Sequence, residues 1–206
     1  ELSRLVRLKA RGLFELNLDY FRHWSDGVEM EWEEGYPSMG KVYSPELERL
    51  LGPARQLDEP LTARHEDIAN SLQVVYETCA FHVLNGLWER TKSPRLCLAG
   101  GCAMNSVANG KIRSYTPFKE VYIQPAPSDN GTALGAAYFV WNQVLGKPRT
   151  FVMEHALWGT SYDNSELPQS CADLHCLNFE TLEETCRATA RLIADGNVVG
   201  WFQGRM

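Results

Sequence analysis

Two stretches of the chain follow the same plan: Arg95-Leu-Cys-Leu-Ala-Gly-Gly-Cys-Ala-Met-Asn105 and Glu120-Val-Tyr-Ile-Gln-Pro-Ala-Pro-Ser-Asp-Asn-Gly131. Each opens with a short apolar run, continues into a loop with Gly or Pro, and leads into a helical pattern, at 102–111 and 131–145 respectively. Apolar runs of this length are typical of buried strands. Two strand–loop–helix units in succession predict an α/β domain with parallel strands.

The segment before these units has the strongest helical pattern, from about Thr62 to Arg90. Apolar residues recur there at spacings of three and four, in one stripe of Ile68, Leu72, Val75, Cys79, Val83 and Leu87 and a second stripe of Val74, Phe81, Leu84 and Trp88. Two apolar stripes predict a helix that is buried on much of its surface. A shorter helix is predicted at 45–51, with Ser44 as N-cap and Pro45 in its first turn.

The segments at the two ends of the chain show other patterns of apolar and polar residues. Residues 13–20 and 28–33 alternate between apolar and polar side chains on either side of Asp26-Gly27, which predicts a two-stranded β meander. Residues 146–178 show little periodicity and read as a linker. A helix at 182–194, ended by Gly196, and a strand at 198–202 are then predicted to start a second domain. The predicted domains are therefore residues 1–150, a linker at 151–178, and 179–206.

Composition limits the function classes. A formal net charge of −6 disfavours a generic nucleic-acid or anionic-membrane surface, since such partners need clustered Lys and Arg. No apolar run approaches the length of a membrane span, and no secretory signal pattern is present, so we expect a cytoplasmic protein. Six cysteines then read as reduced thiols; Cys171, His175 and Cys176 have no standard zinc spacing. Because the chain starts at Glu1 and stops after a strand-like stretch, we expect it to be part of a longer protein.

The first loop contains Gly100-Gly101 at a strand-to-helix turn. Glycines there let the backbone approach a ligand closely, and the N-terminus of the following helix suits phosphate or another anion. Asn105, about one turn into that helix, could hydrogen-bond such a ligand. The alternative is a tight turn that needs positive φ, and the residues alone leave both interpretations open.

The second loop carries Asp129 directly before a helix. A single Asp in this position is usually a helix N-cap, but it can also be an oxygen ligand for a divalent metal held beside phosphates. One carboxylate does not bind a metal tightly, so further ligands would have to come from elsewhere. The five histidines include no pair three or four residues apart that could supply them from one helix.

Two long motifs resemble the hallmarks of the O-carbamoyltransferase family, which includes nodulation and antibiotic-tailoring carbamoyltransferases. They are Cys97-Leu-Ala-Gly-Gly-Cys-Ala-Met-Asn-Ser-Val-Ala-Asn-Gly110 and Ile123-Gln-Pro-Ala-Pro-Ser-Asp-Asn-Gly-Thr-Ala-Leu-Gly-Ala-Ala137. The helical phrase Asp67-Ile-Ala-Asn-Ser-Leu-Gln73 also matches, and a similar phrase occurs in tRNA threonylcarbamoyladenosine-modifying ATPases. The resemblance covers most of residues 45–160 and resumes at 190–206.

The resemblance implies a specific fold and reaction. Residues 1–150 would be the second half of an ATPase domain of the actin, sugar-kinase and heat-shock-chaperone type (ribonuclease H-like), with the β meander added. Residues 179–206 would start a YrdC-like domain. That domain makes carbamoyl-adenylate from carbamoyl phosphate and ATP, and the first domain passes the carbamoyl group to an acceptor hydroxyl with the help of an iron-type divalent metal.

By position in the motifs, Gly100, Gly101 and Asn105 would belong to the nucleotide site, and Asp129 would be a metal ligand. The resemblance places the catalytic base and two histidine ligands in a segment upstream of this chain. We therefore expect the chain alone to lack a complete active site. Two alternatives stay open: a tRNA-modifying relative, disfavoured by the acidic balance and the YrdC-like segment, and a non-catalytic nucleotide-binding module.

Overall fold

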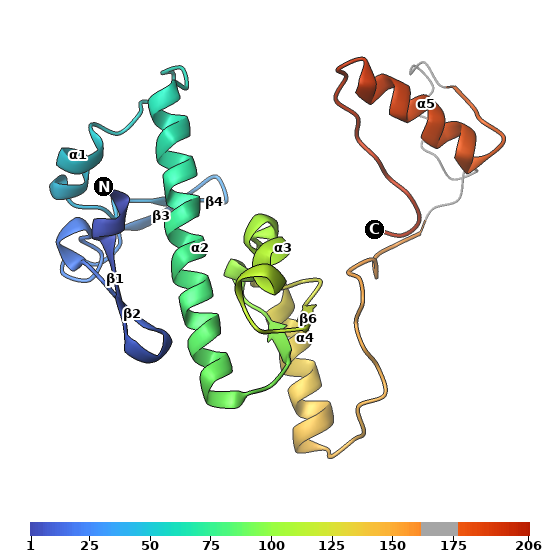
Figure 1. Ribbon diagram of the computed structural model, residues 1–206. Helices are drawn as coiled ribbons and strands as arrows, with labels where there is room; N and C mark the ends of the chain where they lie inside the picture. Colours follow the sequence, from blue (N-terminus) through green and yellow to red (C-terminus); the bar gives the residue numbers. More distant parts are fainter. Residues whose placement is uncertain (162–176) are drawn as a thin grey trace. The chain divides into compact units, whose positions relative to one another are not determined.

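The structure, a computed structural model, describes residues 1–161 and 177–206 (Figure 1). The chain divides into two compact units, Glu1–Arg149 and Thr150–Met206, and each is described by itself. The strands are β1 (Val6–Lys9), β2 (Leu13–Leu16), β3 (Met30–Glu33), β4 (Tyr36–Met39), β5 (Arg95–Leu98) and β6 (Glu120–Ile123). The α-helices are α1 (Pro45–Leu51), α2 (Ala63–Thr91), α3 (Ser106–Tyr115), α4 (Asn130–Phe139) and α5 (Leu182–Ala194).

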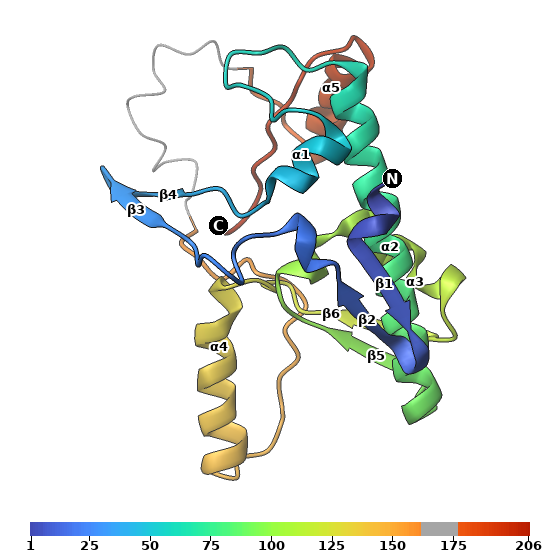
Figure 2. The ribbon, with the colours of Figure 1, turned by 90° about the vertical axis from the view of Figure 1, so that its left-hand side faces the viewer.

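The first unit has a mixed α/β architecture built around α2. The β1–β2 hairpin and α3 both pack against this helix (Figure 2). Strands β5 and β6 pair in parallel, in the register Arg95↔Glu120 to Leu98↔Ile123, which confirms the prediction of parallel strands. Parallel pairing requires a crossover connection, and α3 supplies it.

A small apolar core joins α2, α3 and the parallel strands. Its buried members are Phe81, Leu96, Ile112 and Phe118, and partly buried Leu84, Leu87, Trp88, Leu98 and Val121 surround them. The core residues that α2 contributes, from Phe81 to Trp88, lie on its C-terminal half, so the predicted apolar stripes are covered there. Nearer its N-terminus, Leu72 and Val74 are 53% and 55% exposed, so the helix is less buried there than the two stripes predict.

The glycine at position 86 lets the β1–β2 hairpin approach α2 at backbone distance. A Cβ on Gly12, whose φ is +76°, would lie 2.8 Å from the Cα of Gly86. Beside this contact, Nε2 of His82 lies 2.7 Å from the carbonyl oxygen of Lys9 and 3.0 Å from that of Leu13. His82 is therefore a hydrogen-bonded residue of the helix–hairpin interface.

The predicted meander across Asp26-Gly27 is wrong. Residues 13–16 pair with Val6–Lys9 across the turn at Arg11-Gly12, and Met30–Glu33 pairs with Tyr36–Met39, so two separate antiparallel hairpins form. Residues 17–20 explain the difference, because the Oδ1 of Asn17 accepts a hydrogen bond from the N–H of Asp19 and the chain enters a 3₁₀ turn there. That turn ends the strand after Leu16.

Local signals predicted three helices well. The side chain of Ser44 accepts a hydrogen bond from the N–H of Glu46 at the start of α1. Helix α2 starts one residue after Thr62, whose N–H donates to Nδ1 of His65 (3.1 Å). In the second unit, Thr181 and Glu184 form a reciprocal capping box at the start of α5.

The second unit has no ladder of strands among its described residues. Helix α5 ends at Ala194, and the φ of +84° at Gly196, two residues later, confirms the predicted stop. The predicted strand at 198–202 is not formed, because the described part of this unit offers it no partner. Instead, the N–H of Gly159 donates to the carbonyl of Met206 (2.7 Å), and Ser161 and Arg205 form an isolated bridge. In the described ranges, no helix is both long and apolar enough to cross a bilayer.

Candidate functional site

The two motif loops meet at one edge of the parallel strand pair. They follow β5 and β6, whose carboxyl ends lie side by side because the strands are parallel. The N–H of Gly100 donates a hydrogen bond to the carbonyl of Pro127 (2.6 Å), and Ser128 Oγ lies 3.5 Å from where a Cβ on Gly101 would be. The structure thus brings Gly100 and Gly101 together with the loop that carries Asp129.

The two glycines differ in what they require. Gly100 has a φ of +96°, which strains any side chain other than glycine, and no atom lies within 4 Å of the position that its Cβ would take. The turn alternative is therefore correct for the backbone of Gly100, while the space beside it is open to a ligand. Gly101 begins the 3₁₀ turn η4 (Gly101–Met104), and its φ does not lie in the left-handed region.

The predicted helix at 102–111 starts later than expected. The α-helical segment begins at Ser106, and the residues before it form η4. Asn105 is the N-cap of α3 rather than a residue one turn inside it: its Oδ1 accepts a hydrogen bond from the N–H of Ala108 (3.0 Å). A side-chain acceptor at the N-cap satisfies backbone N–H groups that the first turn otherwise leaves unpaired.

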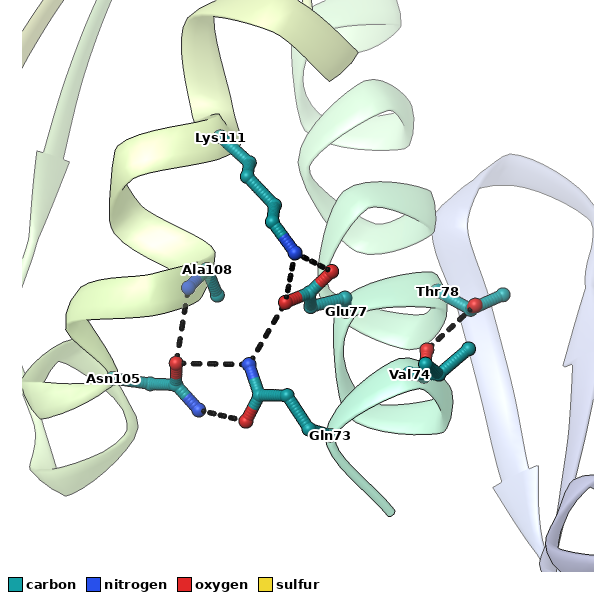
Figure 3. Close-up of polar contacts among 7 residues, drawn as sticks. All are labelled: Gln73, Val74, Glu77, Thr78, Asn105, Ala108 and Lys111. Carbon is teal, nitrogen blue, oxygen red and sulfur yellow. Dashed lines mark hydrogen bonds and ion pairs between the residues drawn. The ribbon is translucent and has the colours of Figure 1, made fainter. Parts of the chain in front are cut away.

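Asn105 also contacts α2, a feature that sequence reasoning missed. Its amide forms two hydrogen bonds with the amide of Gln73, one in each direction, of 2.8 and 3.1 Å (Figure 3). Gln73 Nε2 in turn donates to Oε1 of Glu77 (2.9 Å), and Lys111 Nζ lies 2.7 Å from both oxygens of Glu77. In the sequence, this helix face was indicated only by the family-like segment 67–73, of which Gln73 is the last residue.

Further contacts from neighbouring residues hold η4. The hydroxyl of Tyr76 donates to the carbonyl of Cys102 (2.9 Å), and Nδ2 of Asn109 donates to the carbonyl of Ala103 (2.7 Å). Partial burial of the phenol raises the pKa of Tyr76. The Lys111 ammonium, followed by the Gln73 amide, lowers the pKa of Glu77 below its ordinary value of 4.5. At neutral pH the site therefore contains a neutral phenol and an ionised carboxylate.

Asp129 lies at the N-cap position of α4, but its carboxylate makes no capping hydrogen bond. Its backbone carbonyl instead accepts from the N–H (3.1 Å) and the hydroxyl (2.6 Å) of Thr132. The carboxylate is exposed, so it can serve as one oxygen ligand of a metal. Among residues 1–161 and 177–206, no group of three His, Cys, Asp or Glu side chains could hold a metal ion; Cys171, His175 and Cys176 lie outside the described residues.

Gly131 allows α4 to start close to its own loop. A Cβ there would overlap the carbonyl oxygen of Ala126, whereas a Cβ on Gly135 would meet no atom within 4 Å. The start of α4 therefore lies against the backbone of the loop before it. The close approach sets where Asp129 sits relative to the preceding loop.

An apolar cavity of about 490 Å³ lies behind the first loop. Leu72, Val75 and Cys79 of α2 line it together with Val6 of the hairpin and Ala99 and Cys102 of the loop. Burial raises the pKa of the Cys79 thiol, which makes it a poor nucleophile at neutral pH. All four cysteines among the described residues are free thiols.

Comparison with known proteins agrees with the motifs. Residues 2–138 match the family model described as carbamoyltransferase N-terminus. An uncharacterized protein of Synechocystis is 37% identical over the whole chain, which covers 32% of that relative. Nodulation protein NolO of Bradyrhizobium diazoefficiens is 36% identical over 79% of the chain, and nodulation protein NolNO of Sinorhizobium fredii is 35% identical over 73%, covering 31% and 22% of those relatives. The chain spans about a third, or less, of the length of these relatives, and it belongs to the carbamoyltransferase family, in the part described as the carbamoyltransferase N-terminus.

Proposed function

We propose that the protein containing this chain transfers a carbamoyl group from carbamoyl phosphate, by way of carbamoyl-adenylate, to a hydroxyl of a small-molecule or oligosaccharide acceptor. Membership of the carbamoyltransferase family and the similarity to nodulation proteins support carbamoyl transfer. The observation that carries the proposed site is the hydrogen bond from Gly100 to Pro127, because it joins both motif loops at the strand ends. Ligands of open α/β sheets bind at such carboxyl ends.

The proposed reaction has three steps. Carbamoyl phosphate and one water give carbamate and phosphate; a carbamate oxygen then bonds to the α-phosphorus of ATP, and pyrophosphate leaves. The acceptor oxygen attacks the carbamoyl carbon, its proton passes to a base, and AMP is the leaving group. The chain's own residues are proposed to bind the adenylate while the carbamoyl group passes to the acceptor.

In this proposal Gly100 and Gly101 let the backbone approach the phosphate of the adenylate, and Asn105 donates an amide N–H to it. Asp129 supplies one carboxylate ligand to an iron-type divalent metal. When bound there, such an ion polarises the carbamoyl carbonyl or neutralises phosphate charge. The base and the two histidine ligands implied by the family resemblance are assigned to no residue of this chain.

We also propose that residues 1–150 form the second half of an ATPase-like, ribonuclease H-like domain and that residues 179–206 begin a YrdC-like domain. The parallel pair β5–β6 with helices after both strands supports the first assignment. For the second, the support is the family resemblance at 190–206 and the presence of α5. A structure of the full-length protein tests both assignments.

The reaction is tested with the full-length protein, labelled carbamoyl phosphate, ATP and ferrous iron. We expect pyrophosphate release that depends on carbamoyl phosphate even without an acceptor, and label transfer when a panel of sugars and oligosaccharides is added. Asp129→Ala should abolish label transfer, while Asp58→Asn, at an exposed carboxylate of the 52–62 loop, should leave it unchanged. A wild-type protein that releases no pyrophosphate with carbamoyl phosphate would contradict the proposal.

A further inference from the structure

The chain of side-chain contacts between α2 and α3 has a defined direction (Figure 3). The N–H of Ala108 can only donate, so the Asn105 atom facing it is the amide oxygen, and the Asn105 amide nitrogen must then face Oε1 of Gln73. Gln73 consequently turns its own nitrogen toward Asn105 Oδ1 and Glu77. A single orientation of both amides satisfies all of these hydrogen bonds.

The charged end of the chain anchors this orientation. Glu77 is only 13% exposed, and both of its oxygens lie 2.7 Å from Nζ of Lys111. Hydrogen bonds between charged groups are stronger than those between neutral ones. A carboxylate with so little contact to water costs free energy when it has no cation beside it. Lys111 therefore keeps Glu77 in the position where it accepts a hydrogen bond from Gln73.

The turn that these residues hold has little apolar anchoring of its own. Within η4 only Ala103 is buried, while Met104 is 63% exposed. Its position therefore depends on polar contacts, and most of them originate on α2 or α3. Asn105, the last residue of the loop, receives its contact from Gln73, which is 32 residues away in the chain.

We infer that Gln73, Glu77 and Lys111 are positioning residues for the proposed nucleotide site: they hold Asn105, and with it the turn after Gly100, in the geometry that binds the adenylate. The inference rests on the proposed function. Nδ2 of Asn105 carries two hydrogens. It donates one to Oε1 of Gln73, and the second is proposed to be donated to the nucleotide. None of the three positioning residues needs to touch the ligand itself.

The test uses the full-length protein and measures two rates at saturating ATP. Pyrophosphate release that depends on carbamoyl phosphate reports adenylate formation, and label transfer to the acceptor reports use of the adenylate at the Asn105 site. Gln73→Met keeps the length of the side chain and removes its hydrogen bonds, and Lys111→Met removes the cation. We expect each to slow label transfer about tenfold, which corresponds to about 1.4 kcal/mol, and to leave pyrophosphate release unchanged. Lys111→Arg should restore transfer, because it keeps the charge beside Glu77.

The matched control is Glu120→Gln. Glu120 also pairs with a cation, Arg95 (3.0 Å), but at the amino ends of β5 and β6, away from the loops. Loss of an exposed pair there should leave label transfer unchanged. If Glu120→Gln slows transfer as much as Gln73→Met does, the effect is general loss of structure and the inference fails.

Amide hydrogen exchange separates this inference from the proposed function. In Gln73→Met we expect faster exchange at residues 101–108 and unchanged exchange in the β1–β2 hairpin. If the wild-type protein transfers the label and Gln73→Met transfers it equally fast, the positioning role is wrong and the proposed function stands. If the wild-type protein transfers no label, the proposed function fails, and the nucleotide part of this inference fails with it. Unchanged exchange at 101–108 would then also refute the claim that Gln73 holds the turn.

Discussion

Gly131 and Gly135 lie one turn apart on α4, yet their surroundings differ. A Cβ at Gly131 would overlap the carbonyl oxygen of Ala126, while a Cβ at Gly135 would meet open space. We expect Gly131→Ala to lower the free energy of unfolding by about 1–3 kcal/mol, as overpacking does. Gly135→Ala should be neutral or stabilising by up to about 1 kcal/mol, since Ala favours helix. Urea unfolding of both variants checks this; equal effects would contradict the close approach at Gly131.

The carboxylate of Asp129 makes no capping hydrogen bond to α4, so its removal should not weaken the helix. We expect Asp129→Ala to keep the wild-type midpoint of urea unfolding, whereas loss of a working N-cap costs about 1 kcal/mol. In the full-length protein the same change should lower the bound iron measured by elemental analysis. Destabilisation of that size with unchanged metal content would restore the N-cap interpretation of Asp129.

At the scale of elements, Glu77 and Lys111 link α2 to α3, and this link should depend on pH. The pKa of Glu77 is lower in the folded protein than its ordinary value of 4.5. Such a carboxyl stabilises the fold above its ordinary pKa and loses that contribution as falling pH protonates it. Glu77→Gln removes the titration. We therefore expect the difference in unfolding free energy between wild type and Glu77→Gln to be largest near neutral pH and to shrink below about pH 4.5.

Urea unfolding of both proteins between about pH 7 and pH 3 measures this difference. Glu15, whose pKa is lowered by its hydrogen bond and charge contact with Lys9, titrates in the same range but is present in both proteins, so its effect cancels. A difference that stays constant over the whole range would show that the Glu77 charge does not stabilise the α2–α3 contact.

The elements also show which signals in the chain are reliable. Helices α1 and α5 match their predicted bounds because Ser44, Thr181 and Gly196 act within a few residues of themselves. The Asp26-Gly27 turn misled the prediction of the meander, since a turn dipeptide does not specify which strands it joins. The turn at Arg11-Gly12 closes the first hairpin instead, and its close packing on Gly86 favours that pairing.

For the whole molecule, the described strands form three sheets of two strands each. Sheets of this size are marginally stable by themselves, so the first unit depends on α2 to cover them. The proposed ribonuclease H-like sheet would need these strands to join others. That arrangement is a proposal for the full-length protein.

We expect the 206-residue chain alone to show no carbamoyl transfer. The described residues offer the Asp129 carboxylate at the motif loops and no group of three metal-ligating side chains, and the chain corresponds to about a third of its relatives. Incubation of the chain with labelled carbamoyl phosphate, ATP, ferrous iron and the sugar panel measures this. Clear ATP-dependent transfer to an acceptor would contradict the expectation and would place a complete site within these residues.

Signals between near neighbours in the chain sufficed to predict α1, α2 and α5, the parallel pair β5–β6 and the two motif loops with Gly100, Gly101 and Asp129. Caps, glycine stops and apolar periodicity act over a few residues, so they can be read directly. The hairpin partners, the N-cap role of Asn105 and its pairing with Gln73 emerged only from the folded chain. These contacts depend on which helix faces and strand edges meet across long separations, and that choice results from many weak packing interactions distributed over the whole unit.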